Sequence, residues 1–254
     1  MNFTNGWLRL RTIFITRKKR IMNKIVPVRS GKQLNFIILC QPRTGSTLLH
    51  TYLNSHPNIY SYGEILRRSS EKKQQINLFS DVFGQHSPAV KSVGLKIFYA
   101  YRDHPEFCGY FREIADNKEI RIIHLTRDDL LSSFLSLKRA EKTQIWSTTG
   151  EKNREQHTNF QPDPEDFKQY LLRNEEESNI VKQLFRNHDM LEVNYESLSS
   201  QPDLTLRKVQ IFLEVPEKKL FSILKKQSGS TKDQPKNFEA LSKIYEDYKK
   251  RKEL

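Results

Sequence analysis

Cysteine is scarce in this chain of 254 residues, which contains only Cys40 and Cys108. They lie far apart, without a C-x-x-C pair or a histidine-rich neighbourhood, which argues against a structural zinc site and suits a reducing compartment. Long apolar runs are also missing, since no stretch approaches the roughly 18 apolar residues of a membrane span. We therefore expect a soluble, cytoplasmic protein that requires no metal.

Acidic residues are absent from residues 1–63, and Glu64 is the first. The whole chain carries a net charge of +13, with a pI of about 9.6, which favours polyanionic partners such as nucleic acid, an anionic membrane surface or a phosphorylated cofactor. Residues 1–34 form a basic arm around Arg17-Lys18-Lys19-Arg20. It partly resembles a transit peptide, but we favour a flexible arm suited to peripheral membrane contact, or an upstream start codon before Met22.

Residues 35–254 are long enough to form one domain with a sizeable core. Apolar and β-branched runs predict strands at residues 36–40, 93–98, 120–126 and 190–195. Helical spacing predicts helices at residues 45–55, 106–117, 128–143, 164–187, 202–213, 217–225 and 237–249. This alternation predicts an α/β fold of three layers, like that of P-loop proteins, with a central parallel sheet flanked by helices. Because ligands bind at the carboxyl ends of such strands, the loops after Cys40 and Thr126 should open into one crevice.

The segment 36–49 is an apolar run, a turn of glycine and hydroxyl residues, and the start of a helical pattern. The unpaired N–H groups and the dipole at a helix N-terminus favour an anion there. In the phosphate loop of NTPases, G-x-x-x-x-G-K-[ST], the first Gly corresponds to Cys40 and the Lys to Ser46, whereas Gly45 and Thr47 are kept. The sequence therefore predicts a nucleotide whose anion is bound without the usual Lys and Mg²⁺ pair.

The residues Pro42-Arg43-Thr44-Gly45-Ser46-Thr47 resemble the 5′-phosphosulfate-binding loop of sulfotransferases that use 3′-phosphoadenosine 5′-phosphosulfate (PAPS). The likeness is greatest to the bacterial carbohydrate branch with the Nod-factor and trehalose enzymes, where Pro-[Lys/Arg]-x-Gly-[Ser/Thr]-[Ser/Thr] follows the first strand. The resemblance implies PAPS as co-substrate, with Arg43 at the oxygen that leaves with the nucleotide. It implies that Thr44, Gly45, Ser46 and Thr47 hold the 5′-phosphate through N–H and hydroxyl groups.

A second segment, 127–136, resembles the 3′-phosphate-binding segment of the same family, in which an Arg after a buried strand precedes a Ser. Arg127 and Ser136 take those roles here. An uninterrupted helix would separate their backbones by roughly 13 Å, so the chain must turn over Asp128 and Asp129 before the helix begins. A helical wheel places Ser132, Ser133 and Ser136 together, opposite the apolar residues.

The acceptor would be a small molecule or an oligosaccharide whose hydroxyl loses its proton to a base. We choose Glu64 as this base because it follows the phosphate-loop helix closely and the related bacterial enzymes carry a Glu in a comparable place. His56 is the rival base, whereas His50 and His124 are interpreted as packed side chains. Trp146, Arg154 and His157 could line a sugar site, and residues 225–232 resemble a late basic loop that closes over the 3′-phosphate.

Two other classes of function compete with the sulfotransferase hypothesis. A P-loop kinase or NTPase would need Lys at position 46, although Asp128 and Asp129 could imitate its magnesium-holding acid. A nucleic-acid-binding protein would fit the charge, but no helix-turn-helix, zinc-finger or RNA-recognition signature occurs. We therefore expect transfer of a sulfuryl group from PAPS to a carbohydrate or glycolipid hydroxyl, with no specific nucleic-acid partner.

Overall fold

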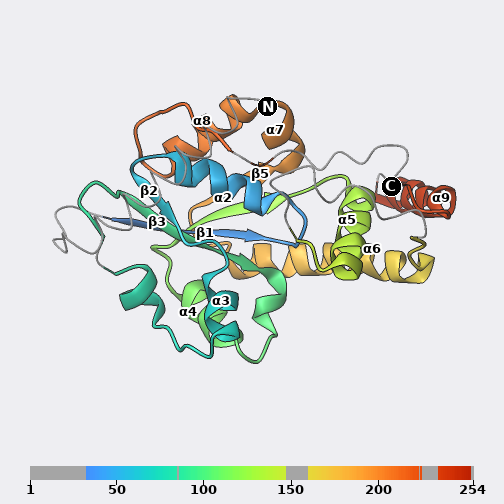
Figure 1. Cartoon of the computed structure of the whole chain (residues 1–254), viewed down its shortest axis with the longest axis horizontal. Helices are drawn as coiled ribbons and strands as arrows, with labels where there is room; N and C mark the ends of the chain where they lie inside the picture. Colours follow the sequence, from blue (N-terminus) through green and yellow to red (C-terminus); the bar gives the residue numbers. More distant parts are fainter. Residues whose placement is uncertain (1–32, 85, 147–159, 223, 225–233, 253–254) are drawn as a thin grey trace.

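The computed structural model describes residues 33–84, 86–146, 160–222, 224 and 234–252 (Figure 1). Five parallel strands form one sheet with the order β2-β3-β1-β4-β5. Their bounds are Leu34–Cys40 (β1), Ile59–Ser61 (β2), Ser92–Phe98 (β3), Arg121–Thr126 (β4) and Met190–Asn194 (β5). The predicted α/β fold with a central parallel sheet is confirmed.

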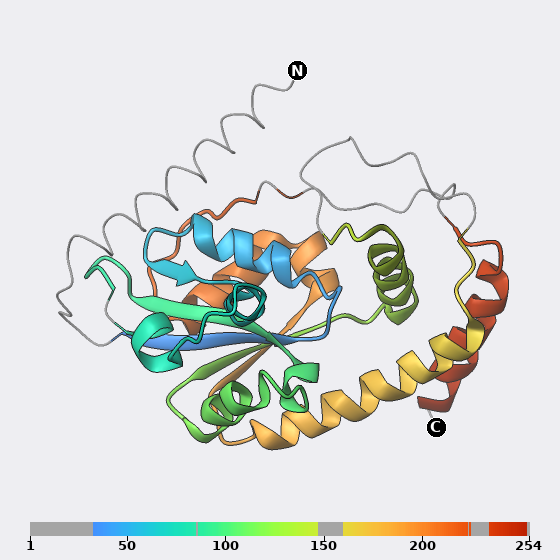
Figure 2. The same ribbon diagram turned by 60° about the horizontal axis from the view of Figure 1, so that its bottom comes forward.

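Helices cover both faces of this sheet. On one face lie α2 (Ser46–Ser55), α7 (Tyr195–Ser200) and α8 (Pro202–Phe212). On the other lie α3 (Ile65–Glu71), the π-helical turn η1 (Leu78–Val82), α4 (Cys108–Asp116) and the carboxyl end of α6 (Pro164–Leu184). Figure 2 shows the same layers after rotation. A 3₁₀ turn, η2 (Tyr99–Arg102), follows β3 directly.

The alternation of side chains along β1 builds the two cores. Ile37 and Leu39 belong to the cluster beneath α3 and α4, whereas Phe36, Ile38 and Cys40 belong to the cluster beneath α2 and α8. All five are fully buried, because a central parallel strand is covered on both faces. Cys40 is thus a small buried core residue.

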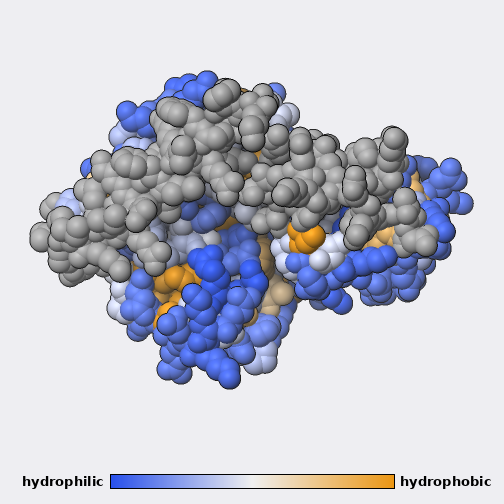
Figure 3. Space-filling model, in the orientation of Figure 1, coloured by the Kyte–Doolittle hydropathy of each residue, from blue (hydrophilic) through white to orange (hydrophobic). Residues whose placement is uncertain are grey.

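A third apolar cluster lies beyond the edge of the sheet. It joins α5 (Leu130–Thr143), α6 and the last helix, α9 (Phe238–Lys252), which lies beside the amino-terminal half of α6 in both views. On the face drawn in Figure 3, the described surface is mostly hydrophilic, with apolar side chains in small separate patches. In the described part of the chain, no helix has the length and apolarity to cross a membrane.

The prediction of a helix at residues 217–225 is wrong, because the described residues of this range are not helical. Two of its backbone N–H groups donate to side chains of helices: Lys218 to Gln210 Oε1 at 2.7 Å and Phe221 to Ser55 Oγ at 3.0 Å. The segment therefore packs in a non-helical form across α8 and α2. The short elements β2, α3 and α7 were not predicted. The predicted basic arm lies outside the described residues, except for its last two.

Candidate functional site

The phosphate-loop segment connects β1 to α2 as predicted. Both Arg43 (φ +66°) and Gly45 (φ +82°) have left-handed backbone conformations, and Gly45 occupies the N-cap of α2. A Cβ at Gly45 would lie only 2.3 Å from Cδ2 of Tyr195, so this position requires glycine for two reasons. The first intrahelical bond runs from the Leu49 N–H to the Gly45 carbonyl at 3.1 Å. The earlier N–H groups of α2 have no carbonyl partner in the helix, which makes this end suitable for an anion.

The hydroxyl groups of this loop differ in their burial and in their hydrogen-bond partners. Thr44 is almost fully buried and its hydroxyl donates to the Gln41 carbonyl at 2.8 Å, so it stabilises the turn itself. Ser46 is also nearly inaccessible, with 4% of its surface exposed. Thr47 accepts a hydrogen bond from the Lys96 ammonium at 3.2 Å. The backbone of the loop, more than its hydroxyl groups, is thus the part that can bind a ligand.

The second predicted segment lies beside the first. Arg43 Nε donates to Ser136 Oγ at 2.9 Å, and Arg127 Nη1 donates to the Arg43 carbonyl at 3.0 Å. The expected turn is present: α5 begins at Leu130, and Asp129 is its N-cap, accepting from the Ser132 N–H at 2.9 Å. Register pairs Cys40 with Leu125, so the ends of β1 and β4 are adjacent. The structure therefore brings Arg43, Arg127 and Ser136 together at one crevice.

Two guanidinium groups, those of Arg43 and Arg127, share this crevice. Burial lowers the pKa of Arg43, and the nearby Arg127 guanidinium lowers it further. Glu196 Oε1 is 3.9 Å from Arg127 Nε, and the Tyr195 ring lies 4.6 Å from the Arg127 guanidinium carbon, a cation–π contact. Like charges held together in a partly buried site favour binding of an anion between them.

Glu64 lies at the N-cap of α3, next to a lysine that sequence analysis did not identify. Glu64 Oε1 is 2.6 Å from Lys96 Nζ, and Glu64 Oε2 accepts from Arg67 Nε at 2.8 Å. Lys96 comes from β3 and is only 3% exposed. Since its ammonium also donates to Thr47, it links the phosphate loop to Glu64. A single charge within the apolar strand 92–98 was the signal that could have revealed it.

The electrostatics around Glu64 keep its carboxylate ionised. Burial by itself would raise the pKa of Glu64, but the Lys96 ammonium and the Arg67 guanidinium more than offset this and hold it below its usual range. A carboxylate bound to two cations is a poor proton acceptor. Glu64 can act as a base only if one of these cations is drawn away.

Comparisons with known proteins identify the family of this chain. A family model described as Stf0 sulphotransferase matches residues 70–235. Nodulation protein H of Rhizobium tropici is 30% identical over 195 residues, which cover 71% of this chain and 76% of that protein. The chain belongs to the Stf0 sulphotransferase family. It is therefore a sulfotransferase, although the family match begins after the phosphate loop and Glu64.

Two further comparisons with this sulfotransferase are weaker. Nodulation protein H of Rhizobium meliloti (strain 1021) is 30% identical over 124 residues, or 44% of this chain and 49% of that protein. The crystal structure of a sulfotransferase from Alicyclobacillus acidocaldarius superposes with a TM-score of 0.48 at 13% identity, covering 85% of this chain and 93% of that one.

Three histidines of this sulfotransferase, His50, His56 and His124, have hydrogen-bond partners within the fold. His56 is fully buried; its Nε2 bonds to the Pro216 carbonyl at 2.8 Å, and its Nδ1 accepts from the Asn58 N–H at 3.0 Å. His50 Nδ1 lies 2.8 Å from Ser61 Oγ, and His124, in β4, bonds to the Tyr99 hydroxyl. Both ring nitrogens of His56 are thus bonded to backbone groups.

Not every polar group of α5 faces the crevice. Ser133 is 1% exposed and accepts from the Tyr170 hydroxyl at 3.0 Å, so the predicted face of three serines is wrong for this residue. Its partner is on α6, which the helical wheel could not include.

Trp146 is 45% exposed, and its carbonyl accepts from Arg43 Nη1 at 2.6 Å. Arg154, His157 and residues 225–232 lie outside the described residues.

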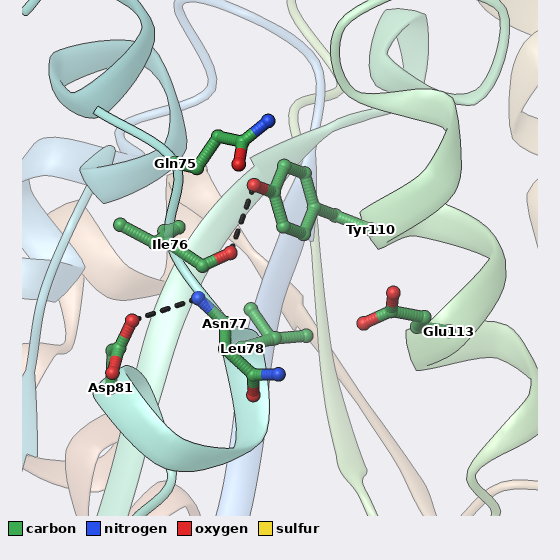
Figure 4. A pocket seen from close by; sticks show the side chains of 7 residues that line it. All are labelled: Gln75, Ile76, Asn77, Leu78, Asp81, Tyr110 and Glu113. Atoms are coloured by element: carbon green, nitrogen blue, oxygen red, sulfur yellow. Dashed lines mark hydrogen bonds between the residues drawn. The ribbon is translucent and has the colours of Figure 1, made fainter. Parts of the chain in front are cut away.

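A cavity in the described part of the chain is separate from these residues. It measures about 440 Å³ and is lined by the segment 75–78, Asp81, Tyr110 and Glu113 (Figure 4). Two of its polar groups are already bonded: Tyr110 donates to the Ile76 carbonyl at 3.0 Å, and Asp81 accepts from the Asn77 N–H at 2.8 Å. A much smaller cavity, about 30 Å³, lies between Thr44 and Arg127. The larger cavity is lined by no residue of the two predicted anion-binding segments, whereas Thr44 and Arg127 of the smaller one belong to them, so we do not assign the site to the larger cavity.

Proposed function

We propose that this sulfotransferase moves a sulfuryl group from PAPS to a hydroxyl of a carbohydrate or glycolipid. The observation that carries the proposal is the contact of the two anion-binding segments through Arg43, Ser136 and Arg127. PAPS carries anionic groups at both the 5′ and the 3′ positions of one nucleoside. A site with a helix N-terminus beside two guanidinium groups is suited to such a ligand.

Each residue has a distinct role in this proposal. The backbone N–H groups of Thr44, Gly45, Ser46 and Thr47 would bind the 5′-phosphate. Arg43 would stabilise the negative charge that develops on the leaving oxygen, as preorganised cations do in phosphoryl transfer. Arg127 and Ser136 would bind the 3′-phosphate. The described residues use one N–H group of the Arg127 guanidinium, and a guanidinium has five to offer.

Glu64 would take the proton of the acceptor hydroxyl, and Lys96 would control when it can do so. An anion bound at the start of α2 competes with Glu64 for the Lys96 ammonium, since Thr47 and Lys96 are already in contact. Loss of this cation raises the pKa of Glu64 and makes it a stronger base. Base strength would therefore increase only once the sulfuryl donor is in place.

The proposal of a sugar acceptor rests on the sequence resemblance and on the position of Trp146. The resemblance to Nod-factor and trehalose enzymes favours a sugar hydroxyl. Trp146 is half exposed, and its carbonyl contacts Arg43, so its ring can pack on a sugar near the crevice.

The first experiment is a calorimetric titration with 3′-phosphoadenosine 5′-phosphate (PAP) and with ATP, each with and without EDTA. We expect tight, metal-independent binding of PAP in preference to ATP. Arg43→Ala and Arg127→Ala should each lose this binding. A preference for ATP with Mg²⁺ would refute the proposal and favour a kinase.

A second experiment tests the base. Glu64→Gln should retain PAP binding but reduce turnover with a sugar acceptor by about 10²- to 10⁴-fold, the range for loss of a general base. Turnover equal to that of the unaltered protein would remove Glu64 from this role.

A further inference from the structure

Two helices begin next to one another at the carboxyl edge of the sheet, but their N-termini are used differently. Among the described residues, the first N–H groups of α2 have no carbonyl partner in the helix, as stated above. At the start of α5 the corresponding groups have protein partners. Asp129 accepts from the Ser132 N–H, and Glu196 accepts from the N–H groups of Asp128 and Asp129, each at 3.2 Å. The backbone of this turn is therefore occupied, so binding of a 3′-phosphate must depend on side chains.

Two further bonds of this turn come from the last helix of the described chain. The hydroxyl of Tyr245, on α9, accepts from the Leu130 N–H at 3.1 Å and donates to the Asp128 carbonyl. Its ring lies 6.2 Å from that of Phe167, on α6, within the third apolar cluster. Tyr245 thus connects the turn that follows Arg127 to a helix about 115 residues further along the chain.

We propose that Tyr245 is a positioning residue for nucleotide binding, through which α9 sets the direction of Arg127 and Ser136. Arg127 directly precedes the held turn, and Ser136 lies on the helix that the turn begins. A shift at Asp128 or Leu130 would move both side chains relative to Arg43, to which both are bonded. This inference rests on the proposed function, because it concerns the 3′-phosphate.

The test compares two tyrosines of α9. Tyr245→Phe removes the hydroxyl that holds the turn. Tyr248→Phe is the matched control: its ring is stacked on that of Tyr245 at 6.4 Å, but its hydroxyl donates to Glu175 at 3.2 Å, away from the turn. The affinities of each variant for PAP and for adenosine 5′-monophosphate (AMP), which lacks the 3′-phosphate, are measured by calorimetry, together with melting temperatures.

We expect Tyr245→Phe to bind PAP about threefold to tenfold more weakly, the effect of one or two lost hydrogen bonds, with AMP affinity unchanged. Tyr248→Phe should keep the PAP-to-AMP preference of the unaltered protein. An unchanged preference in Tyr245→Phe would overturn the inference. If that variant does not fold, Glu196→Gln perturbs the same turn from α7, and an unchanged preference there would overturn the inference equally. Failure of the unaltered protein to prefer PAP over AMP would instead refute the proposed function.

Discussion

Replacement of Lys96 by methionine tests the link between the phosphate loop and Glu64. The ammonium is buried and contacts Glu64 at 2.6 Å and Thr47 at 3.2 Å. Breaking a buried ion pair typically costs 3–5 kcal/mol; because the Glu64 side chain is 21% exposed and keeps Arg67, we expect about 2 kcal/mol here. For a domain of this size, that loss lowers the melting temperature by about 4–8 °C.

The assay is urea unfolding of the unaltered protein, Lys96→Met, Glu64→Gln and the double variant, at two pH values. The double variant should be more stable than the sum of the single effects predicts, by about 1 kcal/mol or more, because the two residues form one pair. The pH dependence has a definite sign. Glu64 has a folded pKa below its ordinary value of 4.5, so the pair contributes stability above that pH and loses it as the pH falls through the folded pKa.

The cost of Lys96→Met should therefore be greatest at pH 7 and smaller at acidic pH, where the Glu64 carboxyl group becomes neutral. Two results would contradict this account of the pair. One is a destabilisation that is equal at both pH values. The other is strict additivity of the single substitutions, since independent residues show no coupling.

Two further predictions concern the loop and its first helix. Gly45→Ala should lose PAP binding and about 1–2 kcal/mol of stability, because its left-handed conformation is strained for alanine and the new Cβ meets the Tyr195 ring at 2.3 Å. Gly109→Ala, where a Cβ meets nothing within 4 Å, is the control, and equal stability of the two variants would contradict the prediction. Burial, assisted by Lys96, lowers the pKa of His50 to about 4. Stability should therefore fall as the pH decreases from about 6.5 to 4, since only the unfolded chain binds the proton there; an NMR titration of His50 with a pKa near 6.5 would refute this.

The sequence was sufficient where a signal is local. The apolar run of β1 predicts a strand buried on both faces. The glycine at position 45 and the surrounding hydroxyl residues predict the anion-binding turn, and Asp129 predicts the beginning of α5. Strand and helix alternation predicts the parallel sheet, because parallel strands require crossover connections. Short elements such as β2, with three residues, are too brief to show a period.

The tertiary structure decided how distant side chains meet. The strand order β3-β1-β4 places β3 and β4 on either side of β1, so Lys96 reaches Glu64 and Thr47, while Arg127 reaches the carbonyl of Arg43. The same packing takes Ser133 out of the predicted polar face. No periodic pattern encodes such contacts, because each depends on the direction in which two separate elements pack. The sequence therefore determined which residues can bind an anion. The packing of β3, α7 and α9 determined which neighbouring side chains, Lys96, Glu196 and Tyr245, contact the segments that carry those residues.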